Sequence, residues 1–153
     1  MTQTQFFDIG YERATQAAVI DALKAAGVKT LVDVRDVANS RRAGFAKKAL
    51  AAGLDEAGIA YIHLRALGTP KAGRQANRAG HMEDFWNIYE QAFEQPEAQL
   101  ALQECAELCG KAPTALLCFC ADGKKCHRHR IAQALEEAGL ERVSLSPRLV
   151  EDI

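Results

Sequence analysis

The chain has 153 residues, of which 48% are hydrophobic and 25% charged, and its formal net charge is −1. These values are typical of one domain with a hydrophobic core, so we expect residues 1–153 to form a single domain, and they exclude a generally basic protein that coats nucleic acid. Because the N-terminus lacks the features of a signal peptide and no apolar run approaches the roughly 20 residues of a membrane helix, we expect a cytoplasmic protein without membrane association.

Short apolar runs alternate along the chain with segments whose apolar residues recur at helical spacing. The segment 65–81 has three glycines, one proline and no apolar period, and is predicted to be a long loop. In chain order the predicted elements are a strand at 6–9, a helix capped by Thr15 and ended by Gly27, a strand at 30–34, a helix at 47–57, a strand at 59–64, the loop, helices at 82–93 and 97–109, a strand at 115–119, a helix ending at Ala138 and a strand at 142–145. This order predicts an α/β fold, a three-layer Rossmann-like or rhodanese-like sandwich with a mostly parallel sheet of about five strands.

The loops that follow parallel strands meet at the carboxyl edge of the sheet, where ligands bind. Basic residues are concentrated in such loops, since 57–82 and 123–135 contain several of them and no acidic residue, and 41–48 adds four more. We therefore expect a cationic crevice that binds an anionic small molecule or nucleic acid. The residues expected to contact this substrate are Asp33, Arg35, Arg41, Arg42, Lys71, Gly123, His127 and Arg128.

The stretch 114–135 reads as a buried strand, a short loop and a helix, and three of the five cysteines lie within it. The first turn of a helix offers free N–H groups and a positive dipole end, which favour an anion and lower the pKa of a nearby thiol. Cys120, Cys126 and Cys118 are therefore candidate catalytic residues, although Cys118 also suits a buried hydrophobic position. Arg128, in the first turn, can pair with a bound anion.

Other polar residues also suit a site. His63, at the end of a strand, is an additional catalytic candidate. Asp33 and Arg35 flank Val34 and point to one side, either as an ion pair that shapes the loop or as substrate contacts. Zinc could be held by Cys120, Cys126 and His129, but their spacing differs from that of zinc sites, so neither a metal nor a cofactor is predicted.

Cys105 and Cys109 lie four residues apart on a predicted helix, beside acidic residues. Both the acids and the helix dipole disfavour a thiolate there. We expect these two cysteines to be inert, with no lowering of the pKa.

Four motifs in a fixed order resemble the domain-of-unknown-function family 488. They are Asp8-Ile9-Gly10-Tyr11-Glu12; Leu31-Val32-Asp33-Val34-Arg35 with Ser40-Arg41-Arg42 and Phe45; His63-Leu64 with Leu67-Gly68-Thr69-Pro70-Lys71; and Cys118 with Cys126-His127-Arg128. The reaction of that family is not established, so this resemblance implies a fold and leaves the function open.

A second, local resemblance concerns the segments 31–35 and 120–126. The first is similar to the strand before the first active-site loop of rhodanese-like sulfurtransferases, and the second to their nucleophile loop. This resemblance implies a persulfide on Cys120, whereas the family pattern emphasises Cys118 and Cys126. A phosphatase loop would place an arginine six residues after the nucleophile, where this chain has Cys126.

Together these features predict an enzyme, a cysteine-dependent transferase or hydrolase with a cysteine- and arginine-lined crevice for a phosphorylated, nucleotide or nucleic-acid substrate. One alternative is a rhodanese-like sulfur carrier with its persulfide on Cys120. The other is a non-catalytic nucleic-acid or nucleotide binding module whose cysteines are structural. The sequence does not indicate an oligomeric state.

Overall fold

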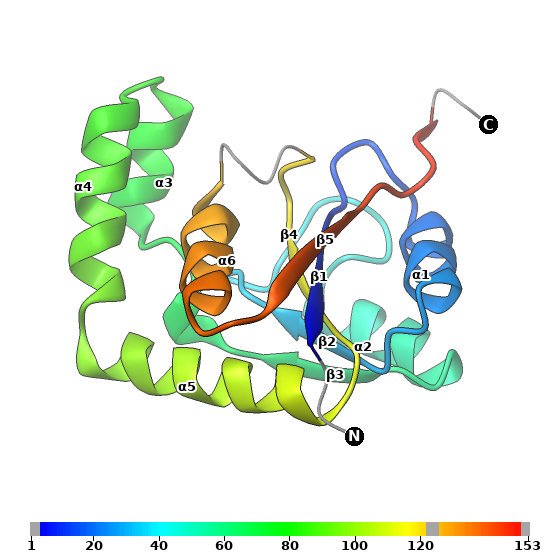
Figure 1. The fold of residues 1–153 in the computed structure, drawn as a ribbon. Helices are drawn as coiled ribbons and strands as arrows, with labels where there is room; N and C mark the ends of the chain where they lie inside the picture. Colours follow the sequence, from blue (N-terminus) through cyan, green and yellow to red (C-terminus); the bar gives the residue numbers. More distant parts are fainter. Residues whose placement is uncertain (1–3, 122–125, 151–153) are drawn as a thin grey trace.

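The computed structural model describes residues 4–121 and 126–150. Five strands in this part of the chain form one sheet with the order β3-β2-β4-β1-β5, and every pair in it is parallel (Figure 1). The strands are β1 (Gln5–Gly10), β2 (Thr30–Asp33), β3 (Ala60–His63), β4 (Thr114–Cys118) and β5 (Glu141–Leu145). The predicted five-stranded parallel sheet is confirmed.

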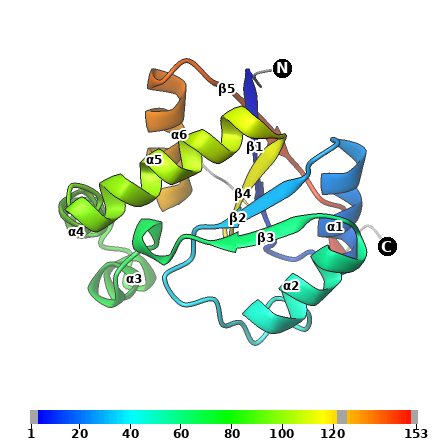
Figure 2. The same cartoon turned by 90° about the horizontal axis from the view of Figure 1, so that it is seen from below.

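Helices cover both faces of the sheet and complete the three layers (Figure 2). α1 and α2 lie on one face, α5 and α6 on the other, and α3 and α4 project together beyond the sheet. The helices are α1 (Gln16–Ala25), α2 (Lys47–Glu56), α3 (Lys71–Arg78), α4 (Met82–Phe93), α5 (Pro96–Lys111) and α6 (His127–Glu137).

Local signals fix the ends of the first helix. The Thr15 side chain accepts a hydrogen bond from the backbone N–H of Ala18, which satisfies a free donor of the first turn. After the helix, Gly27 adopts a φ of 75°, a left-handed conformation that glycine takes without steric cost. Both signals were readable from the sequence, and the predicted helix is confirmed.

The central strand β4 is buried along its whole length because it is covered on both faces. Leu116 and Cys118 belong to a core cluster under α4, α5 and α6, whereas Ala115 and Leu117 belong to a second cluster under α1 and α2. Each fully buried leucine contributes about 1.5–3 kcal/mol to folding. The end of β4 is thus held firmly where the sulfur-bearing residues begin.

The prediction of a loop over 65–81 is wrong, because this segment contains a short 3-10 helix at Arg65–Leu67 and the helix α3. Gly73, which argued against a helix, is buried where α3 packs on α4. A Cβ at this position would come within 2.7 Å of Thr69 Cγ2 and 3.4 Å of Ile88 Cγ2. Glycine is therefore required for the close packing of the helix, at a cost of about 1 kcal/mol in helix propensity.

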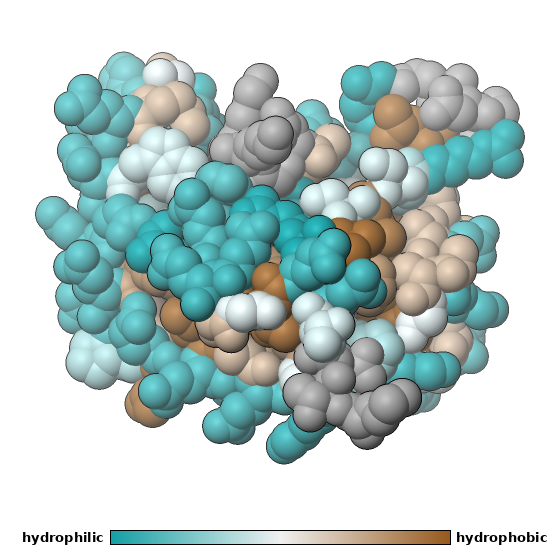
Figure 3. Space-filling model, viewed as in Figure 1, coloured by the Kyte–Doolittle hydropathy of each residue, from teal (hydrophilic) through white to brown (hydrophobic). Residues whose placement is uncertain are grey.

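The face shown in Figure 3 is largely hydrophilic, with smaller hydrophobic areas between the polar groups. Among the described residues, no helix combines the length and the apolar character needed to cross a membrane.

Candidate active site

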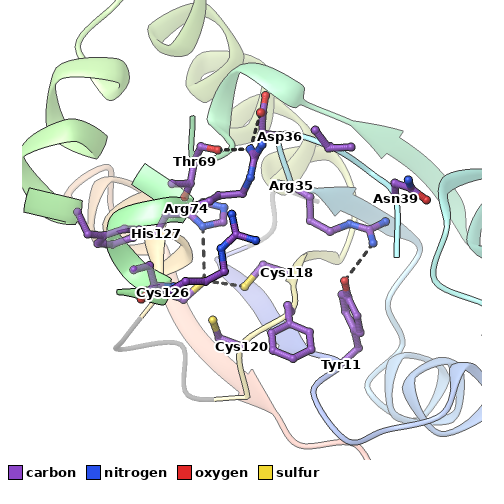
Figure 4. Close-up of a pocket in the computed structure, with 15 residues that line it drawn as sticks. Tyr11, Arg35, Asp36, Asn39, Thr69, Arg74, Cys118, Cys120, Cys126 and His127 are labelled. Carbon is purple, nitrogen blue, oxygen red and sulfur yellow. Dashed lines mark hydrogen bonds and ion pairs between the residues drawn. The ribbon is translucent and has the colours of Figure 1, made fainter. Parts of the chain in front are cut away.

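A pocket of about 320 Å³ opens at the carboxyl edge of the sheet, beyond the ends of β1, β2 and β4 (Figure 4). Its walls come from the ends of these strands and the segments after them, from α3 and α4, and from the start of α6. Its lining includes Tyr11, Arg35, Asp36, Asn39, Arg74, Asn77, Arg78, Phe85, Phe119, His127 and the three cysteines Cys118, Cys120 and Cys126. The sequence predicted a site at this edge from the parallel topology.

Three sulfur atoms converge in this pocket. The Sγ atoms of Cys118, Cys120 and Cys126 all lie within 4.8 Å of one another, and those of Cys118 and Cys126 are 2.8 Å apart. Cys118 and Cys126 are buried, whereas Cys120 is partly exposed. Cys120 is therefore the sulfur of this cluster that a ligand in the pocket can reach.

The cluster places its negative charge on Cys120. Hydrogen bonds from Cys118 and Cys126 lower the pKa of Cys120 to about 3, opposed by burial and helped by the positive charge of Arg128. Burial raises the pKa of Cys118 to about 12. The pKa of Cys126 lies well above the ordinary thiol value because its hydrogen bonds to the other two cysteines favour the protonated form.

The first residues of α6 connect the helix to the sheet. Three consecutive side chains, those of residues 126–128, reach three adjacent strands. Each side chain contacts a different strand, within it or just after its end. Cys126 contacts Cys118 of β4, the His127 Nε2–H donates to the carbonyl of Val34 after β2 at 2.7 Å, and Arg128 Nη1 donates to the carbonyl of Ile9 in β1 at 2.7 Å. The adjacent Cys-His-Arg residues therefore fix the N-terminus of α6 over the pocket.

Arg128 does not line the pocket, because its side chain is only 2% exposed. Its Nε donates to Asp8 Oδ2 at 3.1 Å, and its Nη1 donates to Cys118 Sγ at 3.1 Å. The guanidinium thus takes part in a buried ion pair, and its contact with an anion stays a prediction. Arg128 positions Cys118 from behind the pocket.

Asp33 and Arg35 form the ion pair that was one of the two expected alternatives. Arg35 Nε and Nη2 donate to the two Asp33 carboxylate oxygens at 2.8 and 2.6 Å. Asp33 is fully buried and also accepts a hydrogen bond from the Tyr61 hydroxyl. Arg35 donates to the Tyr11 hydroxyl and lines the pocket, so it alone of the pair faces a ligand.

Other predicted site residues lie outside the pocket lining. The His63 Nε2–H donates to the carbonyl of Arg35 at 2.6 Å. Arg42 donates to the carbonyl of Ala14, and Lys71 borders a separate surface hollow. Arg41 is exposed and is likewise absent from the lining. Gly123 falls outside the described residues.

The sequence missed the arginines of α3, because their segment was assigned to a loop. Arg74 lines the pocket and donates to Asp36 Oδ2 at 2.6 Å, so its charge is largely neutralised. Arg78 is exposed at the pocket and has no ion-pair partner among the described residues. The crevice is therefore less cationic than expected, with Arg78 as its most available positive charge. The acid-free run that contains Pro70 and Gly80 was the signal that could have suggested a bounded basic helix.

Aromatic rings form the apolar part of the pocket. Tyr11 stacks on Phe45 at a centroid distance of 4.3 Å and meets the edge of Phe119 at 5.5 Å. Phe119 is 47% exposed although it follows a fully buried strand. It offers an apolar surface beside the sulfur atoms, suited to a ligand with both an apolar and an anionic part.

The three-sulfur cluster also has the composition of a site for a thiophilic cation, because thiolates favour soft and borderline metals. These three residues differ from the zinc ligands considered in the sequence, since Cys118 takes the place of His129. The ring of His129 lies instead 3.1 Å from Arg142 Nη1.

Cys105 and Cys109 are fully buried on α5. The pKa of Cys105 is raised and that of Cys109 lowered because Cys105 donates a hydrogen bond to Cys109. The expected absence of a lowered pKa is therefore wrong for Cys109. Because both side chains are buried, neither sulfur is accessible to a reagent in solution.

Comparison with known proteins identifies the family. The pattern described as "Domain of unknown function DUF488" matches residues 15–135, which is most of the chain. The chain belongs to the DUF488 family. Three of the four motifs noted in the sequence lie inside this match, and Asp8–Glu12 precedes it. No curated protein and no solved structure matches the chain, and the resemblance to sulfurtransferases stays a prediction.

Proposed function

We propose that the pocket is the active site of a cysteine-dependent enzyme with Cys120 as its nucleophile, acting on an anionic substrate such as a phosphorylated compound or nucleotide. The observation that carries this proposal is the convergence of three sulfurs at the pocket, of which Cys120 is the most accessible. A partly exposed thiolate next to buried thiol donors is a nucleophile held in place.

The anionic nature of the substrate is supported by α3 and by the rim. Arg78 and Asn77 offer N–H donors to the pocket, and no hydrogen-bond partner for these donors is found among the described residues. Phe119 offers an apolar surface on which a planar group can stack. A compound with an aromatic part and a negative group fits both features.

The experiment compares alkylation of Cys120 by iodoacetate, which is anionic, and by iodoacetamide, which is neutral. Free glutathione gives the intrinsic ratio of the two rates. We expect this ratio to be several-fold higher for Cys120 because the pocket attracts the anion. Arg78→Ala should remove the preference, whereas Lys24→Ala on the outer helix α1 should keep it. A Cys120 that reacts no faster than glutathione with either reagent would refute the proposal.

A sulfur carrier with a persulfide on Cys120 is the second candidate. It is favoured by the two thiol groups beside Cys120, which can donate hydrogen bonds to an anionic terminal sulfur. Incubation with thiosulfate, followed by peptide mass spectrometry, should then show one added sulfur on Cys120 that cyanide removes as thiocyanate. A binding module with structural cysteines would show neither this adduct nor the fast alkylation.

A further inference from the structure

Cys126 has two neighbours that bear on its chemistry. Its Sγ lies 2.8 Å from Cys118 Sγ and 3.5 Å from His127 Nδ1, and within 4.8 Å of Cys120 Sγ. Cys126 is only 4% exposed. Its thiol is therefore close to Cys120 on the protein side of the pocket and is shielded from solvent.

The tautomer of His127 follows from its hydrogen bond. The carbonyl of Val34 can only accept, so the Nε2 of His127, 2.7 Å away, carries the ring proton. This leaves a lone pair on Nδ1, the nitrogen that lies next to the Cys126 sulfur. Because burial lowers the pKa of His127, the ring is neutral at neutral pH and can accept the proton of Cys126.

We propose that the pocket performs thiol–disulfide exchange on a small anionic disulfide, with Cys120 as the attacking thiolate, Cys126 as the resolving thiol and His127 as the base for Cys126. This inference rests on the proposed nucleophilic role of Cys120 and adds the reaction, the second thiol and the substrate class.

The reaction balances in two steps. In the first, the Cys120 thiolate attacks one substrate sulfur, a new S–S bond forms, the substrate S–S bond breaks and one substrate thiolate leaves. In the second, His127 Nδ1 takes the proton of Cys126, whose sulfur attacks Cys120. The Cys120–Cys126 disulfide forms, and the second substrate thiolate leaves and takes up the proton from His127. The substrate gains the two electrons that the cysteine pair loses.

Cys126 is assigned as the resolving thiol in preference to Cys118 on the basis of its neighbours. Cys118 is 1% exposed, and its sulfur accepts a hydrogen bond from Arg128, which cannot act as a base. Cys126 is the member of the pair that has a ring nitrogen with a lone pair beside it. Phe119 and Arg78 at the rim suit a disulfide that carries an apolar group and a negative charge.

The test uses dithiobis(nitrobenzoate), an aromatic disulfide with carboxylates, whose thiolate product is coloured. The wild-type protein should release two equivalents per chain in two phases and end with a Cys120–Cys126 disulfide in the peptide map. Cys126→Ser should stop after one equivalent, with the mixed disulfide retained on Cys120. Cys118→Ser removes a thiol donor beside Cys120, so the rate of the first phase should change, but two equivalents should still be released.

His127 is tested against a matched histidine. Both His127 and His63 donate Nε2–H to a backbone carbonyl just after β2, but His127 lies beside a sulfur and lines the pocket, whereas His63 is absent from the lining. His127→Gln should slow the second phase about 100-fold, the usual contribution of a general base, and leave the first phase unchanged. His63→Gln should change neither phase. An unchanged first phase also shows that the variant is folded.

The outcomes separate the two proposals. If Cys120 does not release the first equivalent, the proposed nucleophile fails. If Cys120 reacts normally but the wild-type protein keeps the mixed disulfide, the exchange reaction fails and the nucleophile stands. If Cys118→Ser, and not Cys126→Ser, stops at one equivalent, the assignment of the resolving thiol is overturned.

Discussion

Gly10 at the end of β1 lies against the backbone carbonyl of Cys120, so closely that a Cβ at residue 10 would overlap the carbonyl oxygen and carbon. Neither group can yield easily, because Gly10 is paired in the sheet with Cys118 and the Cys120 carbonyl belongs to the main chain. The position of the nucleophile thus depends on the absence of a side chain in a different strand.

Gly10→Ala should therefore displace Cys120 and destabilise the fold by about 1–3 kcal/mol, the usual cost of overpacking. Urea unfolding gives the stability, and the alkylation rate of Cys120 reports its position. Gly110→Ala is the matched control, because no heavy atom lies within 4 Å of the added Cβ on α5. It should be neutral or stabilising by about 0.5–1 kcal/mol. Equal effects of the two changes would contradict the close contact at Gly10.

A second prediction concerns the buried ion pair of Asp8 and Arg128. Asp8→Asn leaves the guanidinium of Arg128 buried without its counter-charge, and this should cost about 3–5 kcal/mol in unfolding free energy. The more exposed pair of Glu136 and Arg142, whose side chains are 43% and 14% exposed, provides the control, and Glu136→Gln should cost about 0–1 kcal/mol. Similar losses would mean that the Asp8 pair is hydrated in solution.

A third prediction concerns the pH dependence of the alkylation rate of Cys120. Because its pKa is lowered to about 3, the thiolate is already formed above that pH, and the rate with iodoacetamide should stay flat from about pH 5 to 8. Cys126→Ala removes one hydrogen-bond donor and should raise the pKa toward the free-thiol value of about 8.5. The rate of the variant should then rise with pH through the neutral range. A wild-type rate that already rises there would contradict the stabilised thiolate.

A fourth prediction concerns the contact of α3 with α4. Gly73→Val should push α3 away, because the added atoms would meet Thr69 and Ile88. Arg78 would move with the helix, so the preference of Cys120 for iodoacetate over iodoacetamide should fall. The rate with neutral iodoacetamide should not change, since the sulfur cluster lies on β4 and α6. Loss of both reactivities would show that α3 supports the cluster itself.

The sequence was sufficient for the parallel sheet, because β-branched and apolar runs alternate with capped helices. It failed at α3, where the glycine that allows tight packing is also the residue that weakens a helical pattern. It also assigned Arg128 to a bound anion, because its partner Asp8 lies 120 positions away in the chain. Such pairing appears only when β1 and α6 come together. The parallel topology predicts that the three cysteines lie at one edge of the sheet, but the distances between their sulfur atoms can be read only from the structure.

The attachment of Cys126 and the first two residues of α6 to the ends of β4, β2 and β1 has a mechanical consequence. A shift or tilt of the start of this helix cannot break one contact alone, since the side chains of 126, 127 and 128 reach three adjacent strand ends at once. The opening of this region should therefore be all-or-none, and the amide hydrogens of these strand ends and of the first turn should exchange with solvent at one common rate.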